Sequence, residues 1–175
     1  MQGYDIDFFE NRVFEIEGLY SIEHKLYGMR AHRHAAIEIT YVENGRCELN
    51  IHNPLNHSVT SVPVLPNNFI IVNAGVYHDL HVDDDITCAL KTIELKAVEH
   101  TASKPFGLSL GQLLRCTLLV RNMLAQGQPY MVLCDTVQLT RVMTEIIYLH
   151  TRYQWDLPND KYLLMQYKIG EFLLK

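Results

Sequence analysis

The segment Gly28-Met-Arg-Ala-His32-Arg-His34-Ala-Ala-Ile-Glu38-Ile-Thr-Tyr-Val-Glu-Asn-Gly45 carries three side chains of the kinds that bind metals. They are His32, His34 and Glu38, and the intervals between them are even. Successive side chains of a β-strand point to opposite faces, so these three share one face if the segment is extended. The sequence therefore predicts two imidazoles and a carboxylate aimed at one place.

A fourth candidate ligand, His78, follows in the segment Asn73-Ala-Gly75-Val-Tyr-His78. It completes the cluster if its strand lies beside the first segment, and three interpretations are then open. The cluster holds one divalent ion of Zn, Mn, Ni or Fe; or it is a metal-free pocket that hydrogen-bonds a polar effector; or it is a structural polar network. Buried polar groups need partners in all three cases, so the pattern alone does not choose between them.

Residues 11 to about 96 show the pattern of short β-strands separated by turns. The run from Ile37 to Val42 is rich in β-branched and aromatic residues, and it leads into Asn44-Gly45, the pair preferred in two-residue hairpin turns. We expect a hairpin there, with the next strand at Cys47–Ile51. The run from Phe69 to Val72 is wholly apolar, which is typical of a buried strand. Many short strands predict a β-sandwich or barrel.

The two segments resemble the signature motifs of cupins. The first motif has His-x-His, a Glu four residues on, and a Gly seven residues further, which here is Gly45. In the second motif Gly75 is kept, while Asn73 replaces the usual Pro and Asn67-Asn68 replaces the usual Gly-Asp. The positions that bind metal in metal-dependent cupins are all filled, by His32, His34, Glu38 and His78. The resemblance implies a cupin-like double-stranded β-helix, or jelly-roll.

From residue 106 the apolar residues recur at helical spacing, which predicts about three α-helices. The first begins near Leu110 and ends before Gly127, the second follows an expected capping box at Asp135–Gln138, and the third starts at Pro158-Asn159. The second helix carries an apolar stripe formed by Leu139, Val142, Met143, Ile146 and Leu149. We therefore expect a β part at residues 1–105 and a helical part at residues 106–175.

A small cupin barrel followed by amphipathic helices resembles the N-terminal domain of AraC-family transcription regulators. The resemblance implies that the barrel binds a small effector, a sugar or another polar metabolite, and that the helices form a homodimer. It implies no catalytic residues, and DNA would be bound by a separate helix-turn-helix domain. Because Leu173-Leu174-Lys175 ends the last helix without a capping residue, we expect this chain to stop short of that domain.

The apolar stripe of residues 139–149 is then the expected dimer interface, with packing inside one chain as the alternative. For the effector, the expected ligand-binding residues are His32, His34, Glu38 and His78 together with Tyr27, Arg30 and Thr40. Arg30 and Thr40 share the parity of the histidine row, although Arg30 is equally compatible with a place on the rim.

The formal net charge of −5 argues against a chain that grips nucleic acid by itself. The first residues, Met1-Gln-Gly-Tyr-Asp-Ile-Asp, lack the basic start and apolar run of a signal peptide, and no stretch is apolar for long enough to cross a bilayer. We expect a cytoplasmic protein without membrane contact. The competing function is a metal-dependent cupin enzyme of the dioxygenase or isomerase type, and a stand-alone binding module is the third.

Overall fold

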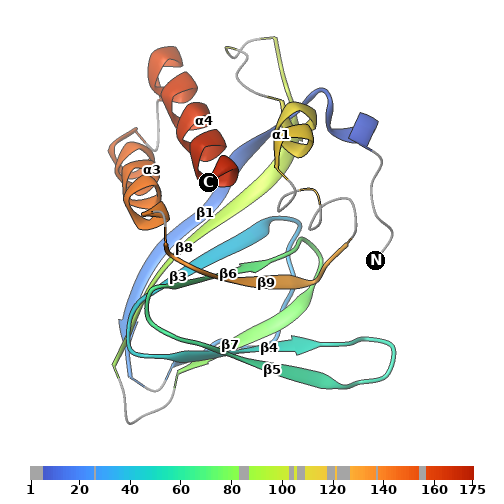
Figure 1. Ribbon diagram of the computed structural model, residues 1–175, viewed down its shortest axis with the longest axis vertical. Coiled ribbons are helices and arrows are strands. Elements are labelled where there is room, and N and C mark those ends of the chain that lie inside the picture. The colour runs from blue at the N-terminus through green and yellow to red at the C-terminus, as the bar shows by residue number, and fades with distance from the viewer. Residues whose placement is uncertain are drawn as a thin grey trace. The chain divides into compact units, whose positions relative to one another are not determined.

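The computed structural model describes residues 6–25, 27–82, 87–102, 105, 109–117, 121, 127–136, 138–153 and 157–175 (Figure 1). In chain order the elements are η1 (Ile6–Phe9), β1 (Arg12–His24), β2 (Tyr27–Gly28), β3 (Ile37–Asn44), β4 (Cys47–His52), β5 (Val59–Val64), β6 (Asn68–Val72), β7 (Tyr77–Val82), β8 (Cys88–Glu99), α1 (Leu110–Cys116), β9 (Tyr130–Cys134), α3 (Leu139–Tyr153) and α4 (Asn159–Leu174). The predicted fold class, mainly β with helices towards the C-terminal end, is confirmed.

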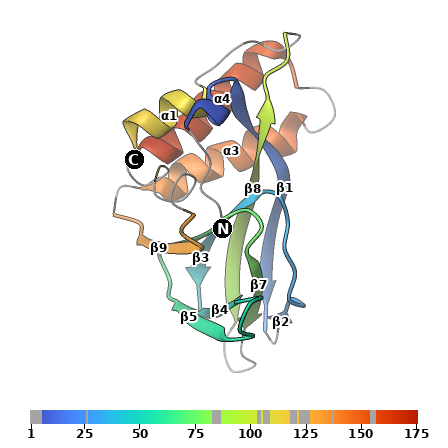
Figure 2. The ribbon, with the colours of Figure 1, turned by 90° about the vertical axis from the view of Figure 1, so that its right-hand side faces the viewer.

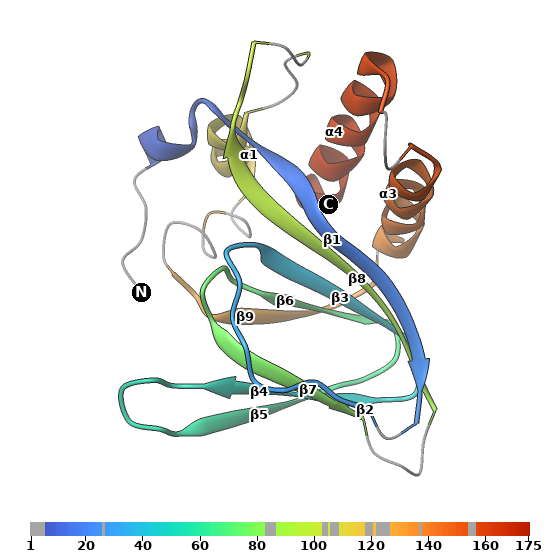
Figure 3. The same cartoon turned by 180° about the vertical axis from the view of Figure 1, so that it is seen from behind.

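The strands form two antiparallel sheets whose order defines a jelly-roll. One sheet has the order β1-β8-β3-β6-β9 and the other has the order β2-β7-β4-β5. The first eight strands pair as in a long hairpin folded over on itself, β1 with β8, β2 with β7, β3 with β6 and β4 with β5. Figure 3 shows the long strands β1 and β8 side by side along the edge of the first sheet. This nested pairing is the jelly-roll arrangement that cupins share with other double-sheet proteins.

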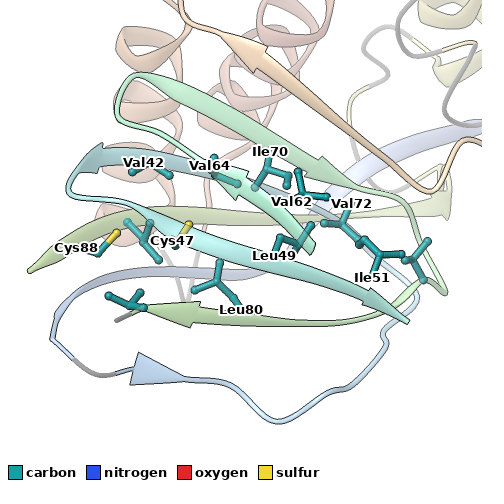
Figure 4. Packing of buried hydrophobic residues seen from close by; sticks show 13 residues of the cluster. Val42, Cys47, Leu49, Ile51, Val62, Val64, Ile70, Val72, Leu80 and Cys88 are labelled. Atoms are coloured by element: carbon teal, nitrogen blue, oxygen red, sulfur yellow. The ribbon is translucent and has the colours of Figure 1, made fainter. Parts of the chain in front are cut away.

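An apolar cluster fills part of the space between the two sheets (Figure 4). Alternate residues of the strands supply it, as the burial of every second residue of β4 shows. The members of this apolar cluster are Val42, Cys47, Leu49, Ile51, Val62, Val64, Ile70, Val72, Val76, Leu80, Val82, Cys88 and Leu90. Burying a side chain of the size of valine or leucine contributes about 1.5–3 kcal/mol, so this cluster is a main source of the jelly-roll's stability.

The hairpin predicted at Asn44-Gly45 is wrong. β3 pairs with β6 and β8, whereas β4 pairs with β5 and β7, so the connection passes from one sheet to the other. Asn44 is the last residue of β3, and only Gly45 has a positive φ, of 76°. A Cβ at Gly45 would also meet the backbone of Thr87 and Cys88. The glycine is therefore needed for a crossover that approaches another strand closely, and not for a hairpin.

The predicted starts of the first and third helices are confirmed. Ser109 caps α1: its hydroxyl oxygen accepts a hydrogen bond from the backbone N–H of Gln112, and its own backbone N–H donates to Gln112 Oε1, which makes a capping box. α4 starts at Asn159 after Pro158. α1 ends at Cys116, and residues 118–120 and 122–126, where the sequence predicted more helix, lie outside the described residues. The capping box predicted before α3 includes residue 137, which is also outside them.

The apolar stripe of α3 is covered within the single chain. Its five side chains, predicted to form a dimer interface, have exposed fractions between 0% and 7%. α3 packs against α4, where Lys168 Nζ lies 2.6 Å from Glu145 Oε2, and α1 also contacts α4 (Figure 2). The stripe therefore follows the alternative of packing inside one chain, and an interface on these helices would have to use other side chains.

The chain divides into two compact units. One comprises residues 1–15, 96–128 and 136–175, and the other comprises residues 16–95 and 129–135. This division departs from the expected boundary at residue 105, because the first residues group with the helices and β9 groups with the jelly-roll. Within the described residues, no helix combines the length and the hydrophobicity needed to span a bilayer.

Candidate metal centre

Backbone hydrogen bonds hold the two histidine-bearing segments together. His32 and His78 form an isolated antiparallel bridge, with N–H to O distances of 2.9 Å in both directions. The N–H of Gly75 donates to the carbonyl oxygen of His34 at 2.8 Å, and Gly75 has a φ of 75°. These bonds align the segment before β3 with the start of β7. The two cupin-like motifs, which are separate segments of the sequence, therefore meet at one place.

The four predicted ligands form one cluster. One candidate ligand atom from each of His32, His34, Glu38 and His78 lies within 4.8 Å of all the others. Glu38 Oε2 is 3.2 Å from His34 Nε2 and 3.4 Å from His78 Nε2. Glu38 and His78 are buried, whereas His32 and His34 are partly exposed. The prediction that even spacing brings these side chains together is confirmed, and the centre is open to solvent on the side of His32 and His34.

Each imidazole of the cluster is fixed through its Nδ1 atom by a backbone carbonyl two residues away. The contacts are His32 to Arg30 O at 3.1 Å, His34 to Ala36 O at 2.9 Å, and His78 to Val76 O at 2.9 Å. A carbonyl oxygen only accepts hydrogen bonds, so each Nδ1 carries the proton. When the rings are neutral, the lone pair of every Nε2 is free. In metal sites this second contact orients the ring and fixes its tautomer.

The arrangement places acceptor atoms against one another. The Nε2 atoms of neutral His34 and His78 and the carboxylate of Glu38 all offer lone pairs, so protons or a cation must lie between them. Burial raises the pKa of Glu38, but hydrogen bonds from His34 and His78 outweigh it and hold that pKa at about 2. The hydrogen bond to Glu38 also raises the pKa of His34. Without a metal, His34 and Glu38 therefore share a proton. A metal cation is able to take the place of that proton.

The donor set fits a divalent transition metal. Three imidazole nitrogens and one carboxylate oxygen are ligands accepted by Zn, Mn, Ni and Fe. Four protein ligands leave open positions on an ion that takes six. The predicted cofactor, one divalent metal of this group, is thus compatible with the residues present.

Comparison with solved structures gives matches of low sequence identity. No protein-family model and no curated protein sequence matches the chain. One similar solved structure is that of Bacillus subtilis oxalate decarboxylase, studied for its Mn(II) centres. The two sequences are 16% identical, the TM-score is 0.37, and the match covers 49% of this chain and 21% of that chain. Another oxalate decarboxylase structure, on substrate binding mode, has 14% identity, 54% and 25% coverage, and a TM-score of 0.38. Drosophila melanogaster CENP-C bound to CAL1 has 13% identity, 43% and 62% coverage, and a TM-score of 0.40.

The chain spans about a fifth to a quarter of the oxalate decarboxylase chains, and likenesses this distant carry no argument about function. Two features of the chain itself decide the fold: the nested strand order, and the convergence of all four ligand positions of the two motifs. The chain has the cupin fold.

A second layer of polar side chains surrounds the carboxylate of this cupin centre. Thr40 Oγ1 donates to Glu38 Oε1 at 3.1 Å and is 2.8 Å from Thr92 Oγ1. The hydroxyl of Tyr20 lies 3.5 Å from Glu38 Oε2 and 3.4 Å from Glu94 Oε1. Burial raises the pKa of Tyr20, and the charges of Glu38 and Glu94 raise it further, so its hydroxyl keeps its proton.

The expected ligand-binding residues fall in different places. Thr40 lies where its parity predicts, in contact with Glu38. The side chain of Arg30 is exposed, in agreement with the rim alternative, and the residue serves the centre through its carbonyl oxygen. The side chain of Tyr27 lies outside the described residues. Sequence reasoning missed Tyr20, Thr92 and Glu94, because only the order of the strands reveals that β1 and β8 lie beside the centre.

Proposed function

We propose that this cupin binds one divalent transition metal through the Nε2 atoms of His32, His34 and His78 and the carboxylate of Glu38. The observation that carries the proposal is the carbonyl contact at each Nδ1, which leaves the three Nε2 atoms as the ring nitrogens available to a metal, in residues whose candidate ligand atoms all lie within 4.8 Å of one another. One proton between one imidazole and the carboxylate would leave the Nε2 lone pair of the other imidazole facing the same carboxylate oxygen. Three imidazoles preset in the same tautomer are what a metal ion requires.

The test is elemental analysis of purified protein after incubation with Mn, Fe(II), Ni or Zn and removal of excess metal. We expect about one equivalent per chain and a large loss in His34→Ala, since losing one of four ligands weakens binding severely. His52→Ala is the matched control, because His52 contacts Asp79 and lies outside the cluster. Equal metal content in the wild type and in His34→Ala would contradict the proposal.

The use of the centre that the site supports best is that of a metal-dependent cupin enzyme of the dioxygenase or isomerase type. Four protein ligands leave open positions, and the partial exposure of His32 and His34 gives small molecules access to them. When bound, the metal would supply a Lewis acid that orients and polarises a ligand. The chain's own residues would hold the metal and, through Thr40 and Tyr20, fix the carboxylate of Glu38.

Catalysis is tested by incubating the metal-loaded protein with pools of small polar metabolites and following each compound by NMR. Conversion that needs the metal and disappears in His34→Ala would support an enzyme. Metal-dependent binding without conversion would support the sensing function instead.

Sensing as the ligand-binding and dimerisation domain of an AraC-type regulator is the second candidate. It is supported by the motif resemblance and by the helical unit, which exposes Tyr148, Leu164 and Tyr167 at 64%, 38% and 54%. Exposed aromatic and aliphatic side chains of this size are common at protein interfaces. In this function an effector bound at the metal would favour one state of the domain, and DNA would be contacted by a domain outside this chain.

Sedimentation of the wild type and of Tyr167→Glu tests this second candidate. A dimer that becomes a monomer in the variant would support the helices as the interface. A dimer that is unchanged by Tyr167→Glu would contradict that interface, and a reading frame that stops at Lys175 would contradict the regulator.

A further inference from the structure

A second carboxylate lies beside the candidate metal centre and has not been assigned a role. Glu94 on β8 is the direct cross-strand partner of Glu38 on β3, so both side chains leave the sheet on the same face. The hydroxyl of Tyr20 lies between the two carboxylates, at 3.5 Å from Glu38 Oε2 and 3.4 Å from Glu94 Oε1. Glu94 is partly buried and is not itself a member of the ligand cluster.

The backbone of β1 leaves room for the carboxylate of Glu94. A Cβ added to Gly18 would lie 2.6 Å from Glu94 Oε2 and 2.8 Å from its Cδ. Gly18 is in the middle of a strand and does not have a positive φ, so conformational freedom is not the reason for a glycine here. Its missing side chain instead makes the space in which the Glu94 carboxylate lies.

Both carboxylates in contact with the Tyr20 hydroxyl are acceptors of hydrogen bonds. Glu38 would be bound by the metal, whereas Glu94 is not a member of the ligand cluster and places a second carboxylate beside it. The hydroxyl of Tyr20 has one proton and lies within reach of both carboxylates, so it satisfies only part of the acceptor capacity of Glu94. A ligand at the metal would therefore meet a carboxylate that repels anions and accepts hydrogen bonds.

We propose that Glu94, seated over Gly18 and contacted by Tyr20, is the specificity-determining residue of the centre, and that it selects a small ligand bearing a hydroxyl or ammonium donor over a carboxylate anion. This inference rests on the proposed metal site. Glu94 accepts a hydrogen bond from the donor of the ligand while another atom of the ligand takes an open position on the metal. An anionic ligand would bind the metal but would lie close to the charge of Glu94.

The test uses formate as an anionic probe of the cobalt-loaded protein, whose visible absorption changes when a ligand enters the metal's coordination shell. Formate is titrated into the wild type, Glu94→Gln and Gly18→Ala. Glu48→Gln is the matched control, because Glu48 is an exposed carboxylate on β4. All four proteins should bind cobalt to the same extent, since none of the substitutions removes a ligand.

We expect Glu94→Gln to bind formate on the order of tenfold more tightly than the wild type, because a negative charge near the metal is removed while the shape is kept. Gly18→Ala, which pushes the carboxylate aside without removing its charge, should change formate affinity in the same direction by a smaller factor. Glu48→Gln should match the wild type.

The experiment distinguishes failure of the metal site from failure of the role of Glu94. Full cobalt loading with the same formate affinity in Glu94→Gln and in the wild type would overturn the role of Glu94 and leave the metal site intact. Absence of cobalt from the wild type would overturn the metal site and this inference with it. An equal gain of affinity in Glu48→Gln would also overturn the inference, because the effect would then come from net charge.

Discussion

The interior of the jelly-roll has two regions of opposite character. The apolar cluster defined above is made of aliphatic and thiol side chains that exclude water (Figure 4). The polar region consists of the four candidate metal ligands and the hydroxyl and carboxyl groups around them. Both are supplied by the same strands: β3 contributes Val42 to the first region and Glu38 and Thr40 to the second, all on one face.

The difference shows which region holds the fold and which carries the chemistry. Burial of the apolar side chains lowers the free energy of the folded state without needing any partner. Burial of Glu38 and His78 raises it unless their charges and lone pairs are matched. The stability of the polar region therefore depends on how its charges and lone pairs are matched, and hence on pH, whereas the apolar region needs no such matching.

The largest effect is expected from breaking the apolar region. Leu49 is fully buried, and Leu49→Ala should lower the free energy of unfolding by about 2–5 kcal/mol, because apolar contacts are lost and a cavity remains. Urea denaturation of metal-free protein measures this. Metal content per folded chain should be unchanged. A loss of metal binding at full folding would show that the two regions are not separable.

Acid should weaken the polar region through Glu38. Its pKa is about 2 in the folded protein against 4.5 for an ordinary glutamate, so its contribution is fully present above pH 4.5 and is lost as the pH falls towards 2. The loss is on the order of 3 kcal/mol in metal-free protein. Urea denaturation between pH 5 and pH 2, in the wild type and in Glu38→Gln, measures it.

Stability should also fall at alkaline pH, because the imidazolium of His34 then loses its proton. The pKa of His34 is raised above 6.5, so its contribution is present below pH 6.5 and is lost as the pH rises through the folded value. Metal-free protein should therefore be most stable between about pH 4.5 and 6.5 with respect to this pair. The free energy of unfolding of Glu38→Gln should depend less on pH than that of the wild type. The same pH dependence in both proteins would show that groups other than this pair determine it.

The two regions also differ in how far the sequence predicts them. Even spacing of His32, His34 and Glu38 is a local property of one strand-like segment, so the ligand cluster follows from parity once β7 is placed beside it. The contacts of Tyr20 and Glu94 depend on β8 lying between β1 and β3, a long-range pairing that leaves no local pattern. The second layer of the site was therefore not predictable from the residues alone.

The turn at Gly45 also depends on long-range strand pairing that the local sequence does not reveal. The dipeptide Asn44-Gly45 has the composition of a hairpin turn, but of its two residues only Gly45 has the positive φ that such turns require. The dipeptide does not reveal that β3 and β4 belong to different sheets, because that depends on the long-range pairings of β3 with β6 and β8. The cupin resemblance, which places a glycine there without requiring a hairpin, predicted the position better than turn propensity did.

Metal should stabilise the folded protein through the polar region. An ion that binds only the folded protein stabilises it by about 2.7 kcal/mol when its concentration is 100 times the dissociation constant. We expect thermal unfolding to shift upwards on addition of Mn or Zn, and the shift to grow with pH because the imidazoles must lose their protons. Metal-free protein should lose stability in the same alkaline range. His34→Ala should show no upward shift; an equal shift in that variant would place the metal elsewhere.

The smallest effect is expected from a histidine on the outer face of the second sheet. His52 Nε2 lies 2.5 Å from Asp79 Oδ2, and Asp79 also accepts a hydrogen bond from Asn50 at 2.9 Å. Because the side chains of His52 and Asp79 are 26% and 17% exposed, water can replace the lost contact in His52→Ala. The variant should lose less than about 1 kcal/mol of stability and no metal, which urea denaturation and elemental analysis measure. Only histidines whose side chains point into the jelly-roll are expected to bind the metal. A loss of metal in His52→Ala would show that histidines outside the inner cluster also bind it.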